Sequence, residues 1–278
     1  MAMKSERMID LIADLRRRDA EFCVVTVVRT QDATSAKAGA KAVVTEDGEI
    51  HGHVGGACVQ GAVRSVAAEV LKGGAPRLIR VKPKERVVER LDADGVEQYK
   101  SGCPSGGTID LFVEPMRRAP RLIVCGASPV ATALAELGAV MGYRIAVAAQ
   151  RQDHIRFSGA DELVEGFDLG ALDITERDFI TVATQGKGDR DALAAALSSP
   201  AAYVALVGSR RKADVLRARL RDHGIAENLI ARLRAPAGLD IAAIEPNEIA
   251  LSIVGEIVQV RRAAVRDQAA PVAAASRN

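Results

Sequence analysis

The period of the hydrophobic pattern changes along the chain and divides it into two halves. In residues 1–117, short apolar runs bounded by turn residues predict strands at 22–30, 76–81 and 108–115, and a hairpin over 41–54 with an Asp47-Gly48 turn. Apolar residues at helical spacing predict helices from Ser5 and over 58–71, whereas residues 83–100 follow neither period. This half is therefore expected to be a mixed α+β domain.

Beyond the segment Pro115–Pro120, strands and helices alternate at short spacing. The predicted strands are 121–126, 143–150, 178–184 and 202–208, and the predicted helices are 128–142, 189–199, 209–224 and 247–265. Such alternation predicts an α/β fold with a Rossmann-like, doubly wound parallel sheet. We expect this domain to span 118–265, after an N-terminal domain of residues 1–117, with a disordered tail over 266–278.

Composition supports this α/β assignment and excludes several function classes. Apolar residues make up 48% of the chain and aromatic residues 3%, so Val, Ala, Leu and Ile must fill the cores. The net charge of +2 does not suggest a nucleic-acid partner. Apolar runs are too short for a membrane span, and the amphipathic N-terminus does not resemble a signal peptide. Four cysteines without paired spacing indicate a reducing compartment, the cytoplasm.

The turn after the first strand of the second half keeps part of a dinucleotide-binding fingerprint. Gly126 occupies the first glycine position, but the third and sixth positions are not glycine. Ser128 and Pro129 are typical of the first residues of a helix. The backbone N–H groups of this turn, which includes Ala127 and Val130, are expected to attract a phosphate. The second strand ends in Gln150-Arg151 instead of the acid that holds an NAD ribose, so NAD is disfavoured.

Polar residues also follow the later strands of this half. Gln185 lies in a glycine-rich turn, and Gly208, Ser209 and Arg210 begin a helix that continues with Arg211 and Lys212. Since ligands bind at the carboxyl ends of parallel strands, we expect these residues to contact a phosphate, Arg210 more than Lys212. The alternative is that the cations form a solvated helix face.

Two cysteines lie on glycine-rich turns of the first half. Gly55 and Gly56 precede Cys58 at a helix start, where the helix dipole favours a thiolate. Cys103 lies in a turn that continues to Gly106 and Gly107, where backbone N–H groups can form an anion site. The alternative is that both are small apolar residues in tight turns. Cys23 and Cys125 lie within apolar strands and are expected in the cores.

The remaining candidates in the sequence are a metal site, paired acids and catalytic residues. His51 and His53 lie near Cys58, but their spacing fits no common zinc pattern, and no metal site is predicted. The acid pairs Asp92/Asp94 and Asp189/Asp191 are interpreted as solvated loop charges. The sequence identifies no catalytic residue.

Longer stretches carry a resemblance to a known family. "AGAKAVVTEDGEIHGHVGGACVQGAV" and "CPSGGTIDLFVEP" resemble the N-terminal domain of XdhC/CoxI proteins, and "RLIVCGASPVATALAELGAVMGYRIAV", "YVALVGSRRK" and "APAGLDIAAIEPNEIALSIVGEI" resemble the Rossmann domain of that family. The resemblance spans residues 5–263. Within the family, the layout and the CPSGG form are most similar to the CoxF group, accessory factors of carbon monoxide dehydrogenase.

This resemblance implies a maturation chaperone for molybdenum hydroxylases, more a carrier than a catalyst. It implies that Cys58, Cys103 and the second-half turns hold molybdenum cofactor, as molybdopterin or its cytosine dinucleotide. The partners implied are an apo molybdenum hydroxylase subunit, such as that of carbon monoxide dehydrogenase, and other maturation factors. Ala57 and Gln150 depart from residues common in the family. We hypothesise that the cofactor lies between the domains, with its phosphates on the Rossmann cleft.

Two other functions are compatible with the sequence. One is a redox accessory protein, an oxidoreductase that binds FAD or, less favourably, NAD(P) in the same cleft, since FAD does not require an acid at Gln150. The other is a scaffold that docks hydroxylase subunits. The long apolar helix over 247–265 also suggests a possible homodimer.

Overall fold

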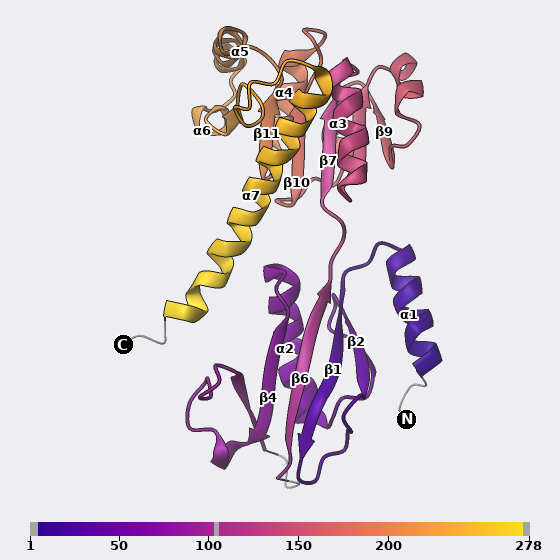
Figure 1. Cartoon of the computed structure of the whole chain (residues 1–278), viewed down its shortest axis with the longest axis vertical. Coiled ribbons are helices and arrows are strands. Elements are labelled where there is room, and N and C mark those ends of the chain that lie inside the picture. Colours follow the sequence, from indigo (N-terminus) through magenta and orange to yellow (C-terminus); the bar gives the residue numbers. More distant parts are fainter. Residues whose placement is uncertain (1–4, 103–105, 275–278) are drawn as a thin grey trace. The chain divides into compact units, whose positions relative to one another are not determined.

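The computed structural model describes residues 5–102 and 106–274, and side chains within 7–102 and 106–263. The chain forms two compact units, the first of Met1–Arg118 with Val265–Asn278 and the second of Ala119–Ala264. Each unit contains a six-stranded sheet and its own buried apolar side chains (Figure 1).

The first unit is a mixed sheet with one helix against each face. Its elements are α1 (Ser5–Arg17), β1 (Phe22–Gln31), β2 (Lys41–Thr45), β3 (Ile50–Gly52), α2 (Ala57–Gly73), β4 (Arg77–Pro83), η1 (Lys84–Arg86), β5 (Glu97–Ser101) and β6 (Thr108–Met116). The strand order is β3-β2-β1-β6-β4-β5, and β4 and β5 are the parallel pair. Since strand side chains alternate, Cys23 and Val25 of β1 pack under α2, whereas Phe22 packs with Met8 of α1.

The second unit is a parallel sheet, as the alternating pattern predicts. Its elements are β7 (Arg121–Cys125), α3 (Pro129–Val140), β8 (Arg144–Ala149), η2 (Arg151–Phe157), β9 (Glu162–Glu165), η3 (Leu169–Ala171), β10 (Asp178–Val182), α4 (Asp189–Ser198), β11 (Tyr203–Leu206), α5 (Arg210–Asp222), α6 (Glu227–Ile230), β12 (Leu233–Arg234) and α7 (Pro246–Ala274). The order β12-β11-β10-β7-β8-β9 reverses between β7 and β10, which confirms the doubly wound, Rossmann-like fold.

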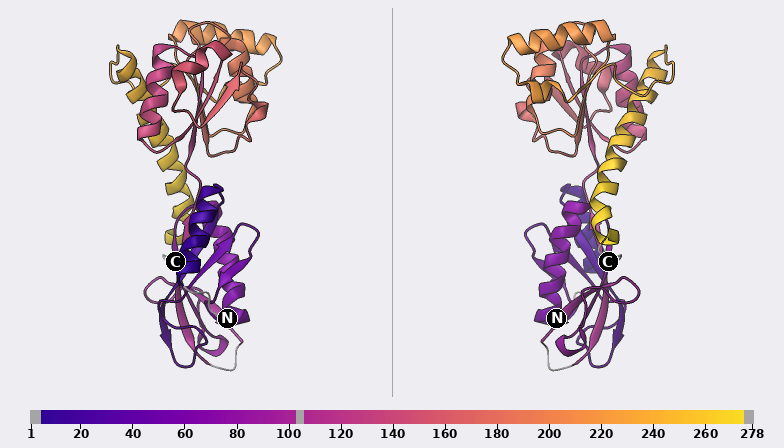
Figure 2. Two further views of the ribbon diagram at one scale, coloured as in Figure 1. Left: turned by 90° about the vertical axis from the view of Figure 1, so that its right-hand side faces the viewer. Right: turned by 90° about the vertical axis from the view of Figure 1, so that its left-hand side faces the viewer.

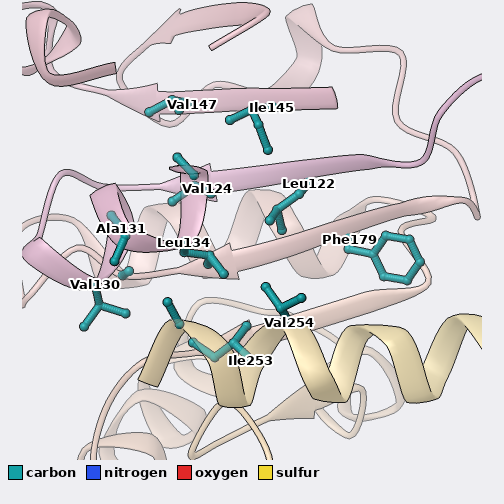
Figure 3. Close-up of a cluster of buried hydrophobic side chains, with 14 of the residues drawn as sticks. Leu122, Val124, Val130, Ala131, Leu134, Ile145, Val147, Phe179, Ile253 and Val254 are labelled. Carbon is teal, nitrogen blue, oxygen red and sulfur yellow. The ribbon is translucent and has the colours of Figure 1, made fainter. Parts of the chain in front are cut away.

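Helices cover both faces of this sheet. Leu122 and Val124 of β7 point into a cluster with residues of α3 and α7, including Leu134 and Ile253 (Figure 3). The alternate side chain Ile123 points into a second cluster, formed with α4, α5 and α6. The central strands are therefore buried on both sides, which explains their continuous apolar sequences.

Helix α7 is continuous in both views of Figure 2 and is anchored by polar as well as apolar contacts. Glu256 accepts hydrogen bonds from the Tyr203 hydroxyl (2.6 Å), Arg234 (3.0 Å) and the Gly238 N–H (2.8 Å). Ile253 and Ile257 pack into the core of their own unit, so this apolar stripe is already covered and does not by itself support a homodimer.

Several elements differ from the sequence expectation. The unassigned segment 83–100 contains η1 and β5, and the short strands β9 and β12 complete the second sheet. Helix α7 runs to Ala274, into the segment 266–278 for which the sequence predicts a disordered tail. Within the described ranges, we find no helix with the length and apolar character that crossing a bilayer requires.

Candidate functional site

The four central strands of the parallel sheet end in turns at its carboxyl edge. Gln150 follows β8, Gly126 follows β7, Gln185 belongs to the turn after β10, and Gly208 follows β11. Backbone hydrogen bonds join the strand ends, since the Gly126 N–H donates to Ala148 O at 2.8 Å and neighbouring strands pair in parallel. Open α/β sheets bind ligands at this edge, where the strand order reverses.

Gly126 is required by close packing between two of these turns. Its φ is +111°, and a Cβ there would lie 2.7 Å from the Ala183 carbonyl oxygen and from Thr184 Cα. The turn after β7 is thus pressed against the turn after β10, which gives this glycine a packing role independent of any ligand.

Helix α3 begins as the sequence predicts, and its first turn leaves little for an anion to bind. The buried Ser128 Oγ accepts from the Ala131 N–H at 3.1 Å, and Pro129 occupies the first helical position. Proline has no N–H, so Val130 supplies the remaining amide of this turn. Arg156 donates to the Ala127 carbonyl at 2.9 Å, which further closes the turn.

Helix α5 begins with more available donors. Ser209 Oγ accepts from the Lys212 N–H at 3.2 Å, and the amides of Arg210 and Arg211 precede the first intrahelical hydrogen bond. Both arginine side chains are exposed and make no ion pair with any described residue. Two amides, the helix dipole and two guanidinium groups make this turn the better phosphate site of the two.

The turn between β10 and α4 contains a buried carboxylate. Asp189 is predicted to be a solvated loop charge, but its side chain is 7% exposed, so this prediction is wrong. It accepts from the Thr184 hydroxyl and pairs with Lys212 Nζ at 2.7 Å. A Cβ on Gly208 would lie 3.0 Å from Lys212 Cδ, so Gly208 makes room for the lysine stem.

The other residues at this edge are solvated. Gln150 is exposed, and the Arg151 side chain is 84% exposed and lies 3.7 Å from Glu165. Gln185 is exposed with a φ of +53°.

A hollow of about 470 Å³ borders the β10–α4 turn, and both acidic and basic side chains line it. Its lining residues are Gly186, Gly188, Asp189, Arg190, Asp191, Leu216, Arg219, Asp222 and His223.

The first cysteine turn of the other unit has an uncapped helix start. Gly55 has a φ of +140°, and a Cβ there would lie 2.8 Å from Val59 Cβ. Gly56 precedes α2 without a side-chain capping hydrogen bond, and Cys58 is half-buried in the first turn. The local geometry therefore agrees with the expected glycine-supported turn.

The second cysteine turn is described only at its flanks, because Cys103 lies outside the described residues. Gly106 has a φ of +67°, and a Cβ on Gly107 would overlap the Ala33 carbonyl oxygen. Strands β1 and β3 run in the same direction, since both are antiparallel to β2, and β6 begins opposite Gln31 at the end of β1. The end of β3 and the start of β6 therefore point to the same end of this sheet.

The remaining cysteines are core residues, as predicted. Burial raises the pKa of the Cys23 and Cys125 thiols to about 12, which keeps them protonated and unreactive. Among the residues that the structure describes, no three His, Cys, Asp or Glu side chains cluster as a metal site would require.

A second buried acid was also missed from sequence. Asp110 is buried and accepts from both Arg80 (2.7 Å) and Arg29 (3.0 Å) on one face of the first sheet. Arg80 also pairs with Asp92 at 2.5 Å, so the prediction of a solvated Asp92 is wrong. Hydrogen bonding and the charge of Asp110 raise the pKa of Arg80. The signal available in the sequence was the alternation along 108–115, which places Asp110 opposite the core face.

Two family models match the chain in the order of its two units. The model of the XdhC and CoxI family matches residues 15–82, and the model of the XdhC Rossmann domain matches residues 122–257. The chain belongs to the XdhC and CoxI family. The second match contains the strands β8 to β12 and all four turns at the carboxyl edge.

Two curated relatives match the chain over part of their own length. The chain is 33% identical over 256 residues to the uncharacterized protein YqeB of Escherichia coli (strain K12), and the match covers 90% of this chain and 45% of that protein. It is 30% identical over 162 residues to a probable xanthine dehydrogenase subunit of Bacillus subtilis (strain 168), covering 56% and 47%. The chain thus spans about half the length of these two relatives.

A third relative matches along most of both chains. It is described as the molybdenum cofactor insertion chaperone PaoD of Escherichia coli (strain K12), and it is 23% identical over 284 residues. The match covers 89% of this chain and 86% of PaoD, so it includes both units.

Proposed function

We propose that this XdhC and CoxI family member is a molybdenum cofactor insertion chaperone for a molybdenum hydroxylase. The observation that carries the proposal is the similarity to PaoD over 89% of the chain, because it includes both the cysteine turns and the Rossmann unit. The similarity to a xanthine dehydrogenase subunit supports the same enzyme class as client.

The residues at the carboxyl edge fit a phosphate-bearing cofactor. Arg210, together with the amides of the α5 start, would hold a phosphate, and the Gly126 turn would form the adjacent wall. At the uncapped start of α2, Cys58 is proposed as a soft sulfur contact for the metal. When bound, the cofactor supplies the molybdenum centre that the hydroxylase requires. The chain's own groups bind it, orient it and shield it.

The finer parts of the proposal follow from the resemblance to the CoxF group. They are a carbon monoxide dehydrogenase client, other maturation factors as partners, and cytosine dinucleotide as the form carried. Cys103, Gly106 and Gly107 are proposed to form the second thiol-bearing wall. Ser128, Gln150, Arg151, Gln185, Gly208 and Ser209 are proposed to line the nucleotide side.

The proposal is tested by purifying the protein without oxygen from cells that make the cofactor. We expect bound molybdenum and released cytidine nucleotide in equal amounts. Cys58→Ser and Cys103→Ser are expected to fold normally, retain less molybdenum, and leave the client hydroxylase deficient in cofactor. Ala62→Ser, on a later turn of α2, is the control for folding. Full client maturation by both cysteine variants would contradict the assignment.

A redox protein that binds FAD is the alternative, because Gln150, and not an acid, directly follows β8, and FAD does not require an acid at this position. Purified protein with the absorbance of oxidised flavin, and no molybdenum, would favour it over the chaperone.

A further inference from the structure

One buried carboxylate connects three of the four turns at the carboxyl edge. Asp189 begins α4 and accepts a hydrogen bond from the Thr184 hydroxyl, in the turn after β10. Its other oxygen pairs with Lys212 Nζ at 2.7 Å, in the first turn of α5. Thr184 in turn lies against Gly126, where a Cβ would come within 2.7 Å of Thr184 Cα.

Burial makes this contact costly to break. The Asp189 side chain is 7% exposed and Lys212 is 31% exposed, so each charge depends on the other for compensation. Removing one partner of such a pair leaves a buried charge without compensation. The loss of folding free energy is then larger than the stabilisation that the intact pair provides. The lysine stem also crosses Gly208, which fixes its path along the start of α5.

The turn held by Asp189 has a strained backbone, and its other contacts are the Phe167 ring, which lies against Gly188, and a few backbone hydrogen bonds. Gly186 and Gly188 both have a φ of +93°, and Gln185 has a φ of +53°. The Gly186 N–H points to Asp189 Oδ1 at 3.4 Å, and the Lys187 N–H reaches Thr184 O at 3.2 Å. A backbone with this many left-handed residues needs outside contacts to keep one conformation.

We propose that Asp189 and Lys212 are positioning residues that fix the β10–α4 turn and the start of α5 in the geometry that binds the nucleotide part of the ligand. The proposal rests on the chaperone function above, since it concerns the same edge. It changes the role expected for Lys212, which holds the site in shape and leaves phosphate contact to Arg210.

The first test is hydrogen exchange of the full-length protein without ligand. Asp189→Asn keeps the shape but not the charge, and Lys212→Met keeps the stem. Each is expected to speed exchange of the amides in 184–188 by about tenfold, with the centres of α3 and α5 unchanged. Arg221→Met, which removes an exposed ion pair between Arg221 of α5 and Glu227 of α6, is the control and is expected to change nothing in this turn. Wild-type exchange rates in both charge variants would overturn the proposal.

The second test measures binding of cytidine diphosphate by calorimetry. Each single variant is expected to weaken binding by about tenfold, and the double variant by less than the product of the two, because the residues act as a pair. Unchanged affinity with a loosened turn would show a purely structural role and overturn the positioning role. If wild-type protein bound no cytidine diphosphate, the proposed nucleotide site would fail, and the exchange result would still decide whether the pair holds the turn.

Discussion

The starts of α3 and α5 have the same sequence signal and different surroundings. Each follows a parallel strand through a glycine, and each has a serine whose Oγ accepts from the third helical amide. At α3 the serine is buried, proline removes one N–H, and the glycine presses against the neighbouring turn. At α5 the serine is exposed and followed by two exposed arginines.

This difference separates two roles that a nucleotide fingerprint usually combines. The α3 turn provides a tightly packed wall, and the α5 turn provides charge and free donors. The start of a helix binds anions through the helix dipole and through backbone N–H groups that have no acceptor within the helix. The number of such N–H groups that remain unbonded therefore determines how well the turn binds an anion. By this criterion we expect the phosphate of the proposed ligand to bind at α5, although the fingerprint position is at α3.

The largest expected effect comes from Gly126→Ala. A Cβ at this position overlaps backbone atoms of the neighbouring turn and occupies a left-handed backbone conformation, so we expect a loss of about 3 kcal/mol in unfolding free energy. The measurement is urea unfolding of the full chain. Gly142→Ala is the control, because Gly142 has a φ of +80° with nothing within 4 Å, and it should cost about 1 kcal/mol. Equal losses in the two variants would show that the wall is not tightly packed.

The next effect is on ligand affinity at α5. Replacing Arg210 and Arg211 by methionine together should weaken cytidine diphosphate binding by about 2 kcal/mol, roughly thirtyfold, and flatten its salt dependence. Unfolding free energy should not change, since both side chains are exposed. Replacing Arg219 and Arg221 by methionine together, in the last turn of the same helix, removes the same net charge and is the control. Wild-type affinity in the double variant would contradict a phosphate site at α5 and would favour the start of α3.

The two capping serines should differ in their effects. Ser128→Ala is expected to cost about 1 kcal/mol in unfolding free energy, because a buried amide loses its acceptor. Ser209→Ala should cost less, since water can replace the exposed hydroxyl. Urea unfolding of the two variants side by side decides the order, and a larger loss at Ser209 would contradict the contrast between a buried and an open turn.

Gln150→Asp should have the smallest effect. The side chain is exposed, so unfolding free energy should change by less than about 0.5 kcal/mol. If phosphate contacts dominate binding, cytidine diphosphate affinity should also remain within about threefold. A large gain in NAD affinity in this variant would instead indicate that the ribose side of the cleft is intact.

Local signals in the sequence identified the features that depend on adjacent residues. Ser128 with Pro129 marks the start of α3 because capping requires only the first turn, and strand alternation in the second half predicts the parallel sheet. The apolar context of Cys23 and Cys125 was sufficient to place them in the cores.

The features that were missed depend on distant partners. Asp189 looks solvated in sequence, and its burial follows from Lys212, which is brought near by the packing of α4 beside α5. Gly107 is required by the approach of Ala33, a residue on another strand connection. Strands β9 and β12 are too short to show a period, so only pairing along an existing sheet defines them.

The most direct test of the central claim is a nuclear magnetic resonance titration of isotope-labelled full-length protein with cytidine diphosphate. The account predicts the largest shifts at the backbone amides of Arg210 and Arg211, with smaller shifts at Gly126 and Val130. Shifts confined to the α3 turn, with Arg210 and Arg211 unaffected, would contradict it.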